Sequence, residues 1–350
     1  MIFCGDTVFP ENYSNQILDS TDKDFVEKQK IINLESVIQF DEMERKTSGI
    51  ALLSSKNIIN FLKKINVISC CQANNHITDY RTSIKKQKEN LLLNNIHSFG
   101  AGDNLEEASK AFFYLENDIQ YAILAFGWEV ISCKAATSTK PGINPLEYNN
   151  VIKQIDSFFE SYPGTKLICI FHWDYEFEIY PQPSHTQLAF KLIDKGVEAI
   201  IGHHPHIVQG FESYKNKPIF YSLGNFYFPN ANYNGHEIKF SEEAKHGLCV
   251  ELKPNIKKIN LYWTYLKDNK KLLVLKKEKL FNSEKINKLS QFSGMSHKEY
   301  IDWFKKNRIK RKLLPIYKTI DSKIEISIND NINLFRQSII NFLVKIGLKK

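Results

Sequence analysis

The sequence predicts an α/β protein with two β-sheets. Residues 45–230 alternate helical and strand patterns, which are separated by short turns containing Gly, Pro or Asn. Three further strand patterns follow at 247–253, 258–266 and 271–276 with no helix between them, which is typical of antiparallel strands. Because both kinds of strand are expected, we predict two sheets and not one purely parallel sheet.

The first half of the alternating region is predicted to contain β-α units and one hairpin. Ser55 can cap a helix that leads to a strand at 66–71, and a second helix is expected at about 82–94. Residues 112–116 and 119–126 are strand-like runs joined by Asn-Asp, which favours a β-hairpin.

The second half repeats the helix-strand pattern. Residues 145–161 are expected to form a helix, after which Pro-Gly turns the chain into a strand at 165–171. A helix at 184–195 ends at Gly196, before the apolar run 197–201. A histidine-rich segment therefore begins where a strand ends.

The composition is that of a soluble globular protein, with 43% hydrophobic and 25% charged residues. No apolar run approaches the roughly 20 residues of a membrane span, and Met1 leads directly into a short run that ends at Asp6. The six cysteines fall almost all in predicted strands without Cys-x-x-Cys spacing, so we expect buried, reduced thiols. We expect a cytoplasmic protein, at most peripheral to the inner face of the membrane.

The last hundred residues differ from the rest in charge. Residues 251–350 hold 24 Lys and Arg against 9 Asp and Glu, a net charge of +15, whereas residues 1–250 carry a net charge of −7. Beyond about 280, Lys-rich helical patterns replace the alternation, so we predict a domain at 1–280 and a basic helical extension at 281–350. The extension is either an accessory helical pair with solvated lysines or an amphipathic element that contacts an anionic membrane or polymer.

Three histidines, His203, His204 and His206, directly follow the apolar run 197–201. Imidazole is the commonest protein metal ligand near neutral pH, and Pro205 stiffens the turn from which two of these rings can project. A polar surface loop would account for the same residues. The choice depends on what the other strand ends provide.

Other polar side chains also follow apolar runs directly. They are Asp6, Asn33 with Glu35, Asn74 with Asn75 and His76, and His172. Ligands of α/β sheets bind beyond the carboxyl ends of the strands, so these strand ends predict a single site. Carboxylate, carboxamide and imidazole groups suit one or two divalent ions of Mn, Fe or Zn. His76, beside the ligand candidate Asn75, could protonate a leaving oxygen as general acid.

Six ordered motifs carry a resemblance to a known family. In their order and spacing, residues 1–250 resemble the CapA family of poly-γ-glutamate capsule biosynthesis proteins. The motifs are Gly5-Asp6, Asn33-Leu34-Glu35, Ala73-Asn74-Asn75-His76, His172-Trp173-x-x-Glu176, Gly202-His203-His204-Pro205-His206 and Ser222-Leu223-Gly224-Asn225-Phe226. That family is related to the calcineurin-like metallophosphoesterases, which implies a four-layer α/β/β/α sandwich with a dinuclear metal site.

The resemblance also implies roles for individual residues. One metal would be held by Asp6 and His206, the second by Asn75, His172 and His204, with Glu35 bridging and His76 as the acid. The residues that would contact substrate or support the ligands are Asn33, Asn74, Glu176, His203 and Asn225.

Three positions depart from the pattern. Val8 stands where the wider phosphoesterases have the histidine of Asp-x-His, so the first metal loses an imidazole. Asp174 and Arg81 stand where glycines are usual, and we expect both to add charge near the rim of the site. Glu176 could orient a ligand histidine or pair with a surface cation, and Asn225 could face the site or cap a turn.

These observations predict a metal-dependent hydrolase or transferase that acts on a phosphoester or related bond in capsule or surface-polymer biosynthesis. The alternative is a non-enzymatic subunit that binds polymer or assembles a synthesis or export machinery. Either function predicts an anionic polymer or a phosphorylated substrate as partner. A nuclease would place aromatic and basic residues together beside the site, and this sequence does not, so we expect no nucleic acid partner.

Overall fold

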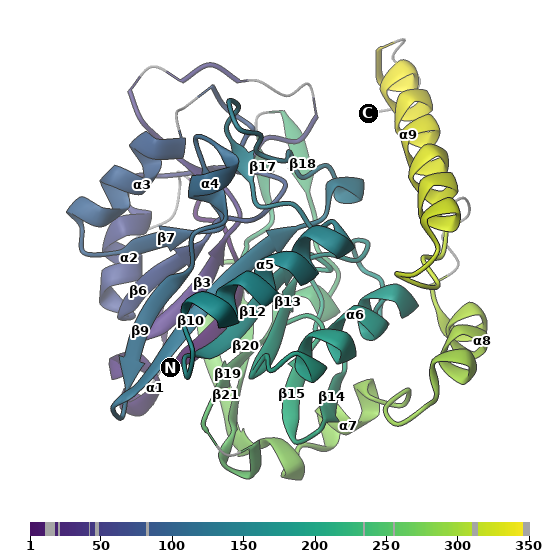
Figure 1. The fold of residues 1–350 in the computed structure, drawn as a ribbon. Helices are drawn as coiled ribbons and strands as arrows, with labels where there is room; N and C mark the ends of the chain where they lie inside the picture. Colours follow the sequence, from purple (N-terminus) through teal and green to yellow (C-terminus); the bar gives the residue numbers. More distant parts are fainter. Residues whose placement is uncertain are drawn as a thin grey trace.

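Two large β-sheets pack face to face between helices (Figure 1). The computed structural model describes residues 1–345 apart from 11–17, 20–21, 42, 46–48, 82–83, 234, 255 and 310–313. Helices cover the outer side of each sheet, and further helices follow at the carboxyl end of the chain. The expected four-layer α/β/β/α sandwich with a helical extension is therefore confirmed.

The larger sheet mixes parallel and antiparallel strands. In spatial order its path is β2 (Leu18–Asp19), β21 (Lys271–Lys279), β20 (Asn260–Lys267), β19 (His246–Glu251), β1 (Ile2–Thr7), β3 (Lys30–Leu34), β6 (Val67–Cys71) and β7 (His97–Phe99), and β16 (Asn225–Tyr227) also pairs with β1. Strands β1, β3, β6 and β7 are parallel, so their carboxyl ends meet at one edge. Strands β19, β20 and β21 are antiparallel, as predicted.

The smaller sheet contains the predicted hairpin. Its order is β14 (Phe211–Tyr214), β15 (Lys217–Phe220), β13 (Ala199–His203), β12 (Lys166–His172), β10 (Ile119–Gly127) and β9 (Phe112–Glu116). The turn between β9 and β10 has positive φ at Asn117 (51°) and Asp118 (61°), which a type I′ hairpin requires. Strands β10, β12, β13 and β15 are parallel, so this sheet also has an edge of carboxyl ends.

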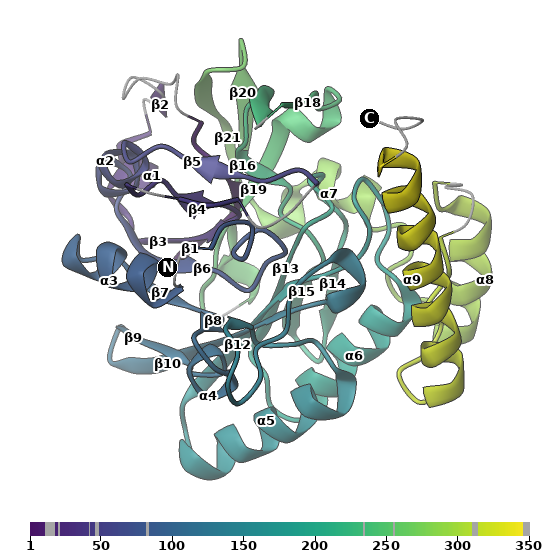
Figure 2. The ribbon, with the colours of Figure 1, turned by 90° about the horizontal axis from the view of Figure 1, so that it is seen from above.

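Side-chain alternation along the strands separates two cores. Phe3 and Ile31 belong to the core shared with β10, β12 and β13, whereas their neighbours Ile2 and Ile32 pack beneath helices. The helices on this outer side are α1 (Lys23–Glu27), α2 (Ile58–Lys64) and α3 (Ile84–Leu93). On the other side, α5 (Tyr148–Ser161) and α6 (Pro183–Asp194) cover the smaller sheet (Figure 2). The six cysteines are buried and free, as expected.

Short elements complete the connections. They are the strand pairs β4 (Val37–Ile38) with β5 (Leu53–Ser54), β8 (Ala101–Gly102) with β11 (Gly142–Ile143) and β17 (Ala231–Tyr233) with β18 (His236–Ile238), the helix α4 (Leu105–Ala108), and the 3-10 turns η1 (Glu129–Ile131), η2 (Glu243–Lys245), η3 (Ile256–Lys258) and η4 (Leu280–Asn282). Ser55 accepts a backbone N–H in the turn just before α2, as expected of a capping serine, although it is not the assigned N-cap position. The cap position is Asn57, whose backbone N–H donates to Ser55 Oγ at 3.2 Å. Residues 82 and 83, at the start of the helix expected there, lie outside the described residues.

The extension consists of α7 (Glu284–Leu289), α8 (His297–Asn307) and α9 (Lys323–Lys345). Helix α8 packs on α6, and its Tyr300 and Phe304 belong to the main core. Helices α8 and α9 lie at the same side of the molecule in both views (Figures 1 and 2). Within the described ranges, no helix combines the length and apolar character needed to cross a membrane. The boundary near residue 280 stays a prediction.

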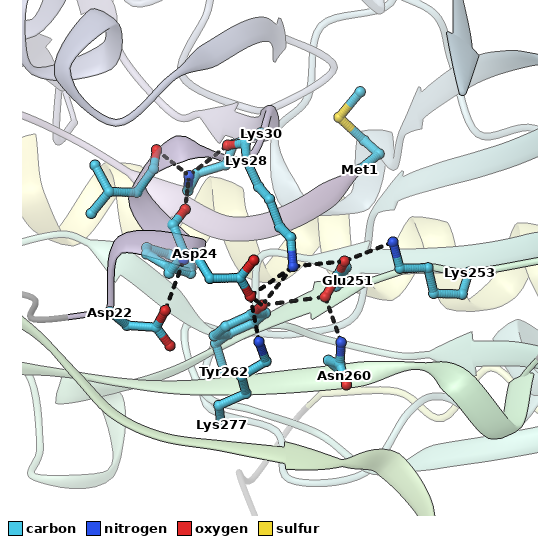
Figure 3. Close-up of polar contacts among 12 residues, drawn as sticks. Met1, Asp22, Asp24, Lys28, Lys30, Glu251, Lys253, Asn260, Tyr262 and Lys277 are labelled. Atoms are coloured by element: carbon cyan, nitrogen blue, oxygen red, sulfur yellow. Dashed lines mark hydrogen bonds and ion pairs between the residues drawn. The ribbon is translucent and has the colours of Figure 1, made fainter. Parts of the chain in front are cut away.

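Charged residues gather at the amino ends of β1 and β3 (Figure 3). Lys28 Nζ lies 2.7 Å from Asp24 and 3.0 Å from Glu251, and Lys253 lies 2.7 Å from Glu251. The buried ammonium of Lys30 donates to backbone carbonyls at the end of α1, which otherwise lack helical partners. The residues of this amino-edge cluster are Asp24, Lys28, Lys30, Glu251, Lys253, Asn260, Tyr262 and Lys277.

Candidate metal centre

The two sheets bring the predicted polar residues together at the carboxyl ends of their parallel strands. The larger sheet and its turns provide Asp6, Asn33, Glu35, Asn74, Asn75, His76 and Asn225, and the smaller sheet provides His172, His203, His204 and His206. We call these residues the carboxyl-edge cluster. All of them are buried except Asn75 and His76, which are partly exposed.

A bulge at Gly5 positions Asp6. The register between β1 and β3 shifts between Cys4 and Asp6, which leaves Gly5 as the extra residue. A Cβ atom on Gly5 would lie 1.9 Å from the carbonyl oxygen of Gly224, so only glycine permits this approach of the neighbouring strand. The Gly-Asp motif is therefore needed by the backbone as well as by the site.

The histidine turn has an unusual backbone. His204 has φ of 97° and His206 has φ of 59°, conformations that residues with a side chain rarely adopt. The backbone N–H of His204 donates to Asp6 Oδ2 at 3.3 Å. The strained turn thus brings the backbone of His204 and the imidazole of His206 to the carboxylate from the other sheet.

Asp6 joins the two sheets through hydrogen bonds and ion pairs. Its Oδ1 accepts from Asn33 Nδ2 at 2.7 Å and lies 3.3 Å from His203 Nδ1, and its Oδ2 lies 3.3 Å from His206 Nδ1. Burial alone would raise the pKa of Asp6, but the hydrogen bonds of His203 and His206 hold it well below its usual range. Asp6 is therefore a carboxylate.

Glu35 is fully buried, and neither of its carboxylate oxygens has a hydrogen-bond partner among the described residues. Its Oε1 lies 3.5 Å from His172 Nε2, 3.8 Å from His206 Nε2 and 4.0 Å from His76 Nε2. Burial, followed by the negative charge of Asp6, raises the pKa of Glu35 well above its usual range. An unbonded buried carboxylate is costly for the protein alone, and a cation would relieve that cost.

The imidazoles around Glu35 have different charge preferences. Burial is the largest cause that holds the pKa values of His172 and His204 well below the usual range, so both rings are neutral and can bind a metal. Burial also disfavours the charged form of His206, but the charge of Glu35 and the hydrogen bond to Asp6 raise its pKa to about 10.

Among the residues that the structure describes, two groups of three have ligand atoms within 4.8 Å of one another. One is Glu35, His204 and His206, and the other is Asp6, Glu35 and His172. Both groups contain Glu35, the residue to which the resemblance assigned the bridging position. The other ligands are grouped differently from the arrangement that the resemblance implies, in which Asp6 is paired with His206 and His172 with His204. Asn75 Oδ1 lies 2.8 Å from His172 Nε2, so a metal at this nitrogen would also meet the amide.

His76 lies at the partly exposed side of the cluster. Its Nδ1 is 2.7 Å from Asp79 Oδ2, and that oxygen also accepts the backbone N–H of Leu52 at 2.8 Å. The Nε2 atom consequently faces Glu35. Sequence reasoning did not assign a role to Asp79, although its position three residues after His76 in a turn is a signal that could have found it.

The remaining predicted residues are Asn33, Asn74, Asn225 and Glu176. Asn74 Nδ2 donates to Asn33 Oδ1 at 3.2 Å, and Asn33 Nδ2 also lies 3.3 Å from His172 Nδ1. Asn225 Oδ1 lies 3.0 Å from His206 Nδ1, so this amide faces the site. Glu176 is exposed, and within the described residues no hydrogen bond or ion pair joins it to a histidine, but its negative charge helps to raise the pKa of His206.

Asp174 does not add charge at the rim, so this prediction is wrong. It is fully buried, and its Oδ1 accepts from the backbone N–H of Gln182 at 2.8 Å and lies 2.7 Å from His185 Nδ1. The side chain thus fixes the loop that follows His172. Arg81 is exposed and pairs with Glu44 at 3.3 Å.

The same loop is tied to the helical extension. Tyr300 Oη donates to the carbonyl of Pro181 at 2.6 Å, and Arg308 Nη2 lies 3.0 Å from the carboxylate of Glu178. The backbone N–H of Phe177 donates to the carbonyl of Pro205, inside the histidine turn. The extension therefore supports a loop that contacts the metal-ligand candidates, which its sequence distance from them does not reveal.

Comparison with known proteins places these features in a family. Residues 2–230 match the family model described as bacterial capsule synthesis protein PGA_cap. The chain is 30% identical over 192 residues to the capsule biosynthesis protein CapA of Bacillus anthracis, covering 53% of this chain and 46% of that protein. It is 33% identical over 186 residues to the PGA biosynthesis protein CapA of Bacillus subtilis (strain 168), covering 51% and 47%.

A solved structure with a similar arrangement is a putative 5′-nucleotidase from Staphylococcus aureus in complex with α-ketoglutarate. It has a TM-score of 0.42 and 10% sequence identity, covering 87% of this chain and 58% of that chain. The chain spans about half the length of the curated CapA relatives it matches. Because the family model covers well over half of its residues, this chain belongs to the bacterial capsule synthesis family PGA_cap, the CapA family.

Proposed function

We propose that this chain is a metal-dependent hydrolase or transferase that acts on a phosphoester or related bond during synthesis of a capsule or surface polymer. The observation that carries the proposal is the buried, unbonded carboxylate of Glu35 among the imidazoles of His172, His206 and His76. Hydrolysis of such a bond needs positive charge at the phosphoryl oxygens and an acid for the leaving group. Both requirements have candidate residues here.

The residues proposed to hold one or two divalent ions of Mn, Fe or Zn are Asp6, Glu35, Asn75, His172, His204 and His206. When bound, such ions would neutralise charge on a phosphoryl oxygen and make a water more acidic. Asn33, Asn74, His203 and Asn225 would hold the ligand side chains in place through the hydrogen bonds and short contacts described above.

His76 is proposed to donate a proton to the leaving oxygen. Asp79 holds Nδ1 and would stabilise the positively charged ring, which leaves Nε2 to carry the transferable proton. Because Asn75 and His76 are the exposed part of the cluster, substrate would approach from their side. The names of the Bacillus relatives support a polymer precursor or an anionic polymer as substrate.

A second candidate is a subunit that binds an anionic polymer without cleaving it. Val8 favours it, because this residue is buried with Leu52 and Phe228 and supplies no imidazole at the position where the wider phosphoesterases have one. Metal bound by the remaining ligands would then hold the polymer and not promote hydrolysis.

The two candidates differ in what His76→Ala does. The purified full chain is assayed with a phosphodiester that has a poor alkoxide leaving group and with an activated aryl phosphate, and its metal content is measured by elemental analysis. We expect His76→Ala to keep its metal and to lose about 10² to 10⁴ in rate on the alkyl substrate, with a smaller loss on the aryl substrate. His97→Ala, which changes an exposed histidine on β7, is the matched control.

Equal losses on the two substrates, or loss of metal with the imidazole, would contradict the role of His76. Wild-type protein that holds metal and binds polyglutamate but turns over no phosphomonoester or phosphodiester would support the binding subunit instead.

A further inference from the structure

Helix α9 carries a row of large apolar side chains that face away from the protein. Successive members are three or four residues apart, so they lie on one face of the helix. Each of these residues exposes between 44% and 76% of its surface to solvent. The members of this outer face are Ile324, Ile328, Ile332, Phe335, Ile339 and Phe342.

The opposite face of α9, which carries the partly buried Ile326 and two asparagines, is the one that packs on the protein. Asn333 Nδ2 donates to Tyr175 Oη at 3.1 Å and to Tyr317 Oη at 3.0 Å, and Asn329 Nδ2 donates to the carbonyl of Ile316 at 3.0 Å. Both asparagines are buried. These hydrogen bonds and the packing of Ile326 therefore set the orientation of the helix, and an apolar stripe of this length is left for another partner.

The charges around α9 favour an anionic partner. The two acidic residues in the described part of the helix, Glu325 and Asp330, are engaged with the protein through Lys318 and Tyr317. The outer face carries no acidic side chain among the described residues, whereas the extension at 281–350 holds 15 Lys and Arg against 6 Asp and Glu.

We propose that the outer face of α9 binds the surface of an anionic lipid bilayer. The apolar side chains would enter the boundary between headgroups and acyl chains, while nearby lysines and arginines meet the lipid phosphates. A second copy of the chain is the less favourable occupant, because that contact would bring two strongly basic extensions together.

This orientation would also bring the metal centre near the membrane. Helix α9 packs against η1, which follows the carboxyl end of β10, at the edge of the sheets where the metal-ligand candidates lie. The helix has 23 residues and is about 34 Å long, so it can lie along the surface as one extended contact. The proposal does not depend on the reaction proposed for the centre.

Vesicle binding of the full chain tests the proposal. We expect co-sedimentation with vesicles of phosphatidylglycerol and phosphatidylcholine, and little with phosphatidylcholine alone. The double variant Ile328→Ser with Phe335→Ser should bind anionic vesicles at least about tenfold more weakly, because less apolar surface enters the bilayer. The matched control is Leu93→Ser with Leu115→Ser, two exposed leucines on α3 and β9, on the opposite side of the molecule (Figure 1).

A fluorescent probe distinguishes insertion from adsorption by charge. In Phe335→Trp, anionic vesicles should shift the indole emission to shorter wavelength, because the ring leaves water. Circular dichroism and thermal unfolding would show that each variant is folded.

Three results would overturn the proposal. The first is a dimer in lipid-free sedimentation equilibrium that the serine variant abolishes, which would make the face a contact between copies. The second is binding to soluble polyglutamate that the serine variant weakens while vesicle binding stays unchanged. The third is vesicle binding that is equally strong in the serine variant, together with no shift of the indole emission when Phe335→Trp binds. That result would mean that charge alone holds the protein to the vesicle.

Discussion

The amino-edge and carboxyl-edge clusters lie at opposite ends of β1 and β3 and satisfy their buried carboxylates in opposite ways. At the amino edge, Glu251 is contacted by Lys28 and Lys253 and accepts hydrogen bonds from Asn260 and Tyr262 (Figure 3). At the carboxyl edge, the oxygens of Glu35 have no hydrogen-bond partner in the described part of the chain.

The two glutamates consequently differ in their preferred protonation state: Glu251 favours the charged carboxylate and Glu35 the protonated form. Burial would raise the pKa of Glu251, but Lys253, Asn260 and Lys28 together lower it to about 2. For Glu35, burial and the charge of Asp6 act in the same direction and raise the pKa. Both side chains are buried, Glu35 just beyond the carboxyl end of β3 and Glu251 on β19 beside Ile2 of β1, so burial does not distinguish them.

The difference shows how a structural cluster can be told from a binding site. A charge whose partners are all supplied by the protein contributes to folding and needs nothing further. A charge that the protein buries without a partner costs stability, and such a cost is retained where a ligand removes it. On this criterion the amino-edge cluster is structural, and the unbonded oxygens of Glu35 favour the proposal that the carboxyl-edge cluster binds a ligand.

The largest effect expected from this comparison is on metal binding. His204→Ala removes a neutral imidazole from the carboxyl edge and should abolish bound metal, whereas Lys253→Met at the amino edge should leave the metal content unchanged. Excess metal should stabilise the wild type and Lys253→Met by about 2.7 kcal/mol at a hundredfold excess over Kd, but not His204→Ala. Elemental analysis and thermal unfolding measure both effects, and equal metal content in the two variants would remove the basis of the comparison.

The same substitution at the two edges should change the stability of the metal-free protein in opposite directions. Glu35→Gln replaces an unbonded buried carboxylate by a neutral group and should raise the free energy of unfolding by about 1 to 3 kcal/mol. Glu251→Gln leaves Lys28 and Lys253 without their shared carboxylate and should lower it by a similar amount. Urea unfolding in the presence of a chelator measures both, and a loss of stability in both variants would contradict the distinction.

The sequence predicts much of the metal centre because its residues directly follow apolar strands. Strand periodicity locates Asp6, His172 and His204 at strand ends. The carboxyl ends of parallel strands lie at the same edge of a sheet, so these residues are expected to lie near one another. Contacts made by loops and helices follow no such rule. The Asp174–His185 pair joins a loop to α6 only after both have packed.

The amino-edge cluster and α9 show the same limit. Glu251 and Lys28 are 223 positions apart, and nothing in either local sequence indicates that they meet. The pattern of α9 predicts an apolar and a polar face. It does not reveal that Asn329 and Asn333 find partners on the protein and so turn the apolar face outward.

The smallest expected effect is the acid dependence of the amino-edge cluster. The pKa of Glu251 is about 2 in the folded protein, whereas an unperturbed glutamate has a pKa of 4.5. The folded form therefore favours the charged carboxylate. The stability from this group is present above about pH 4.5 and is lost as the pH falls toward 2. Because solvent partly reaches the cluster, we expect the stability from this group to amount to about 1 kcal/mol.

Urea midpoints of the metal-free wild type and Glu251→Gln at pH 7, 5, 4 and 3 should therefore converge as the pH falls. Lys253→Met leaves Glu251 with Lys28 as its remaining ion-pair partner, so the loss should be smaller and should be complete at a higher pH. Parallel curves for wild type and Glu251→Gln would show that the ion pairs do not stabilise the fold.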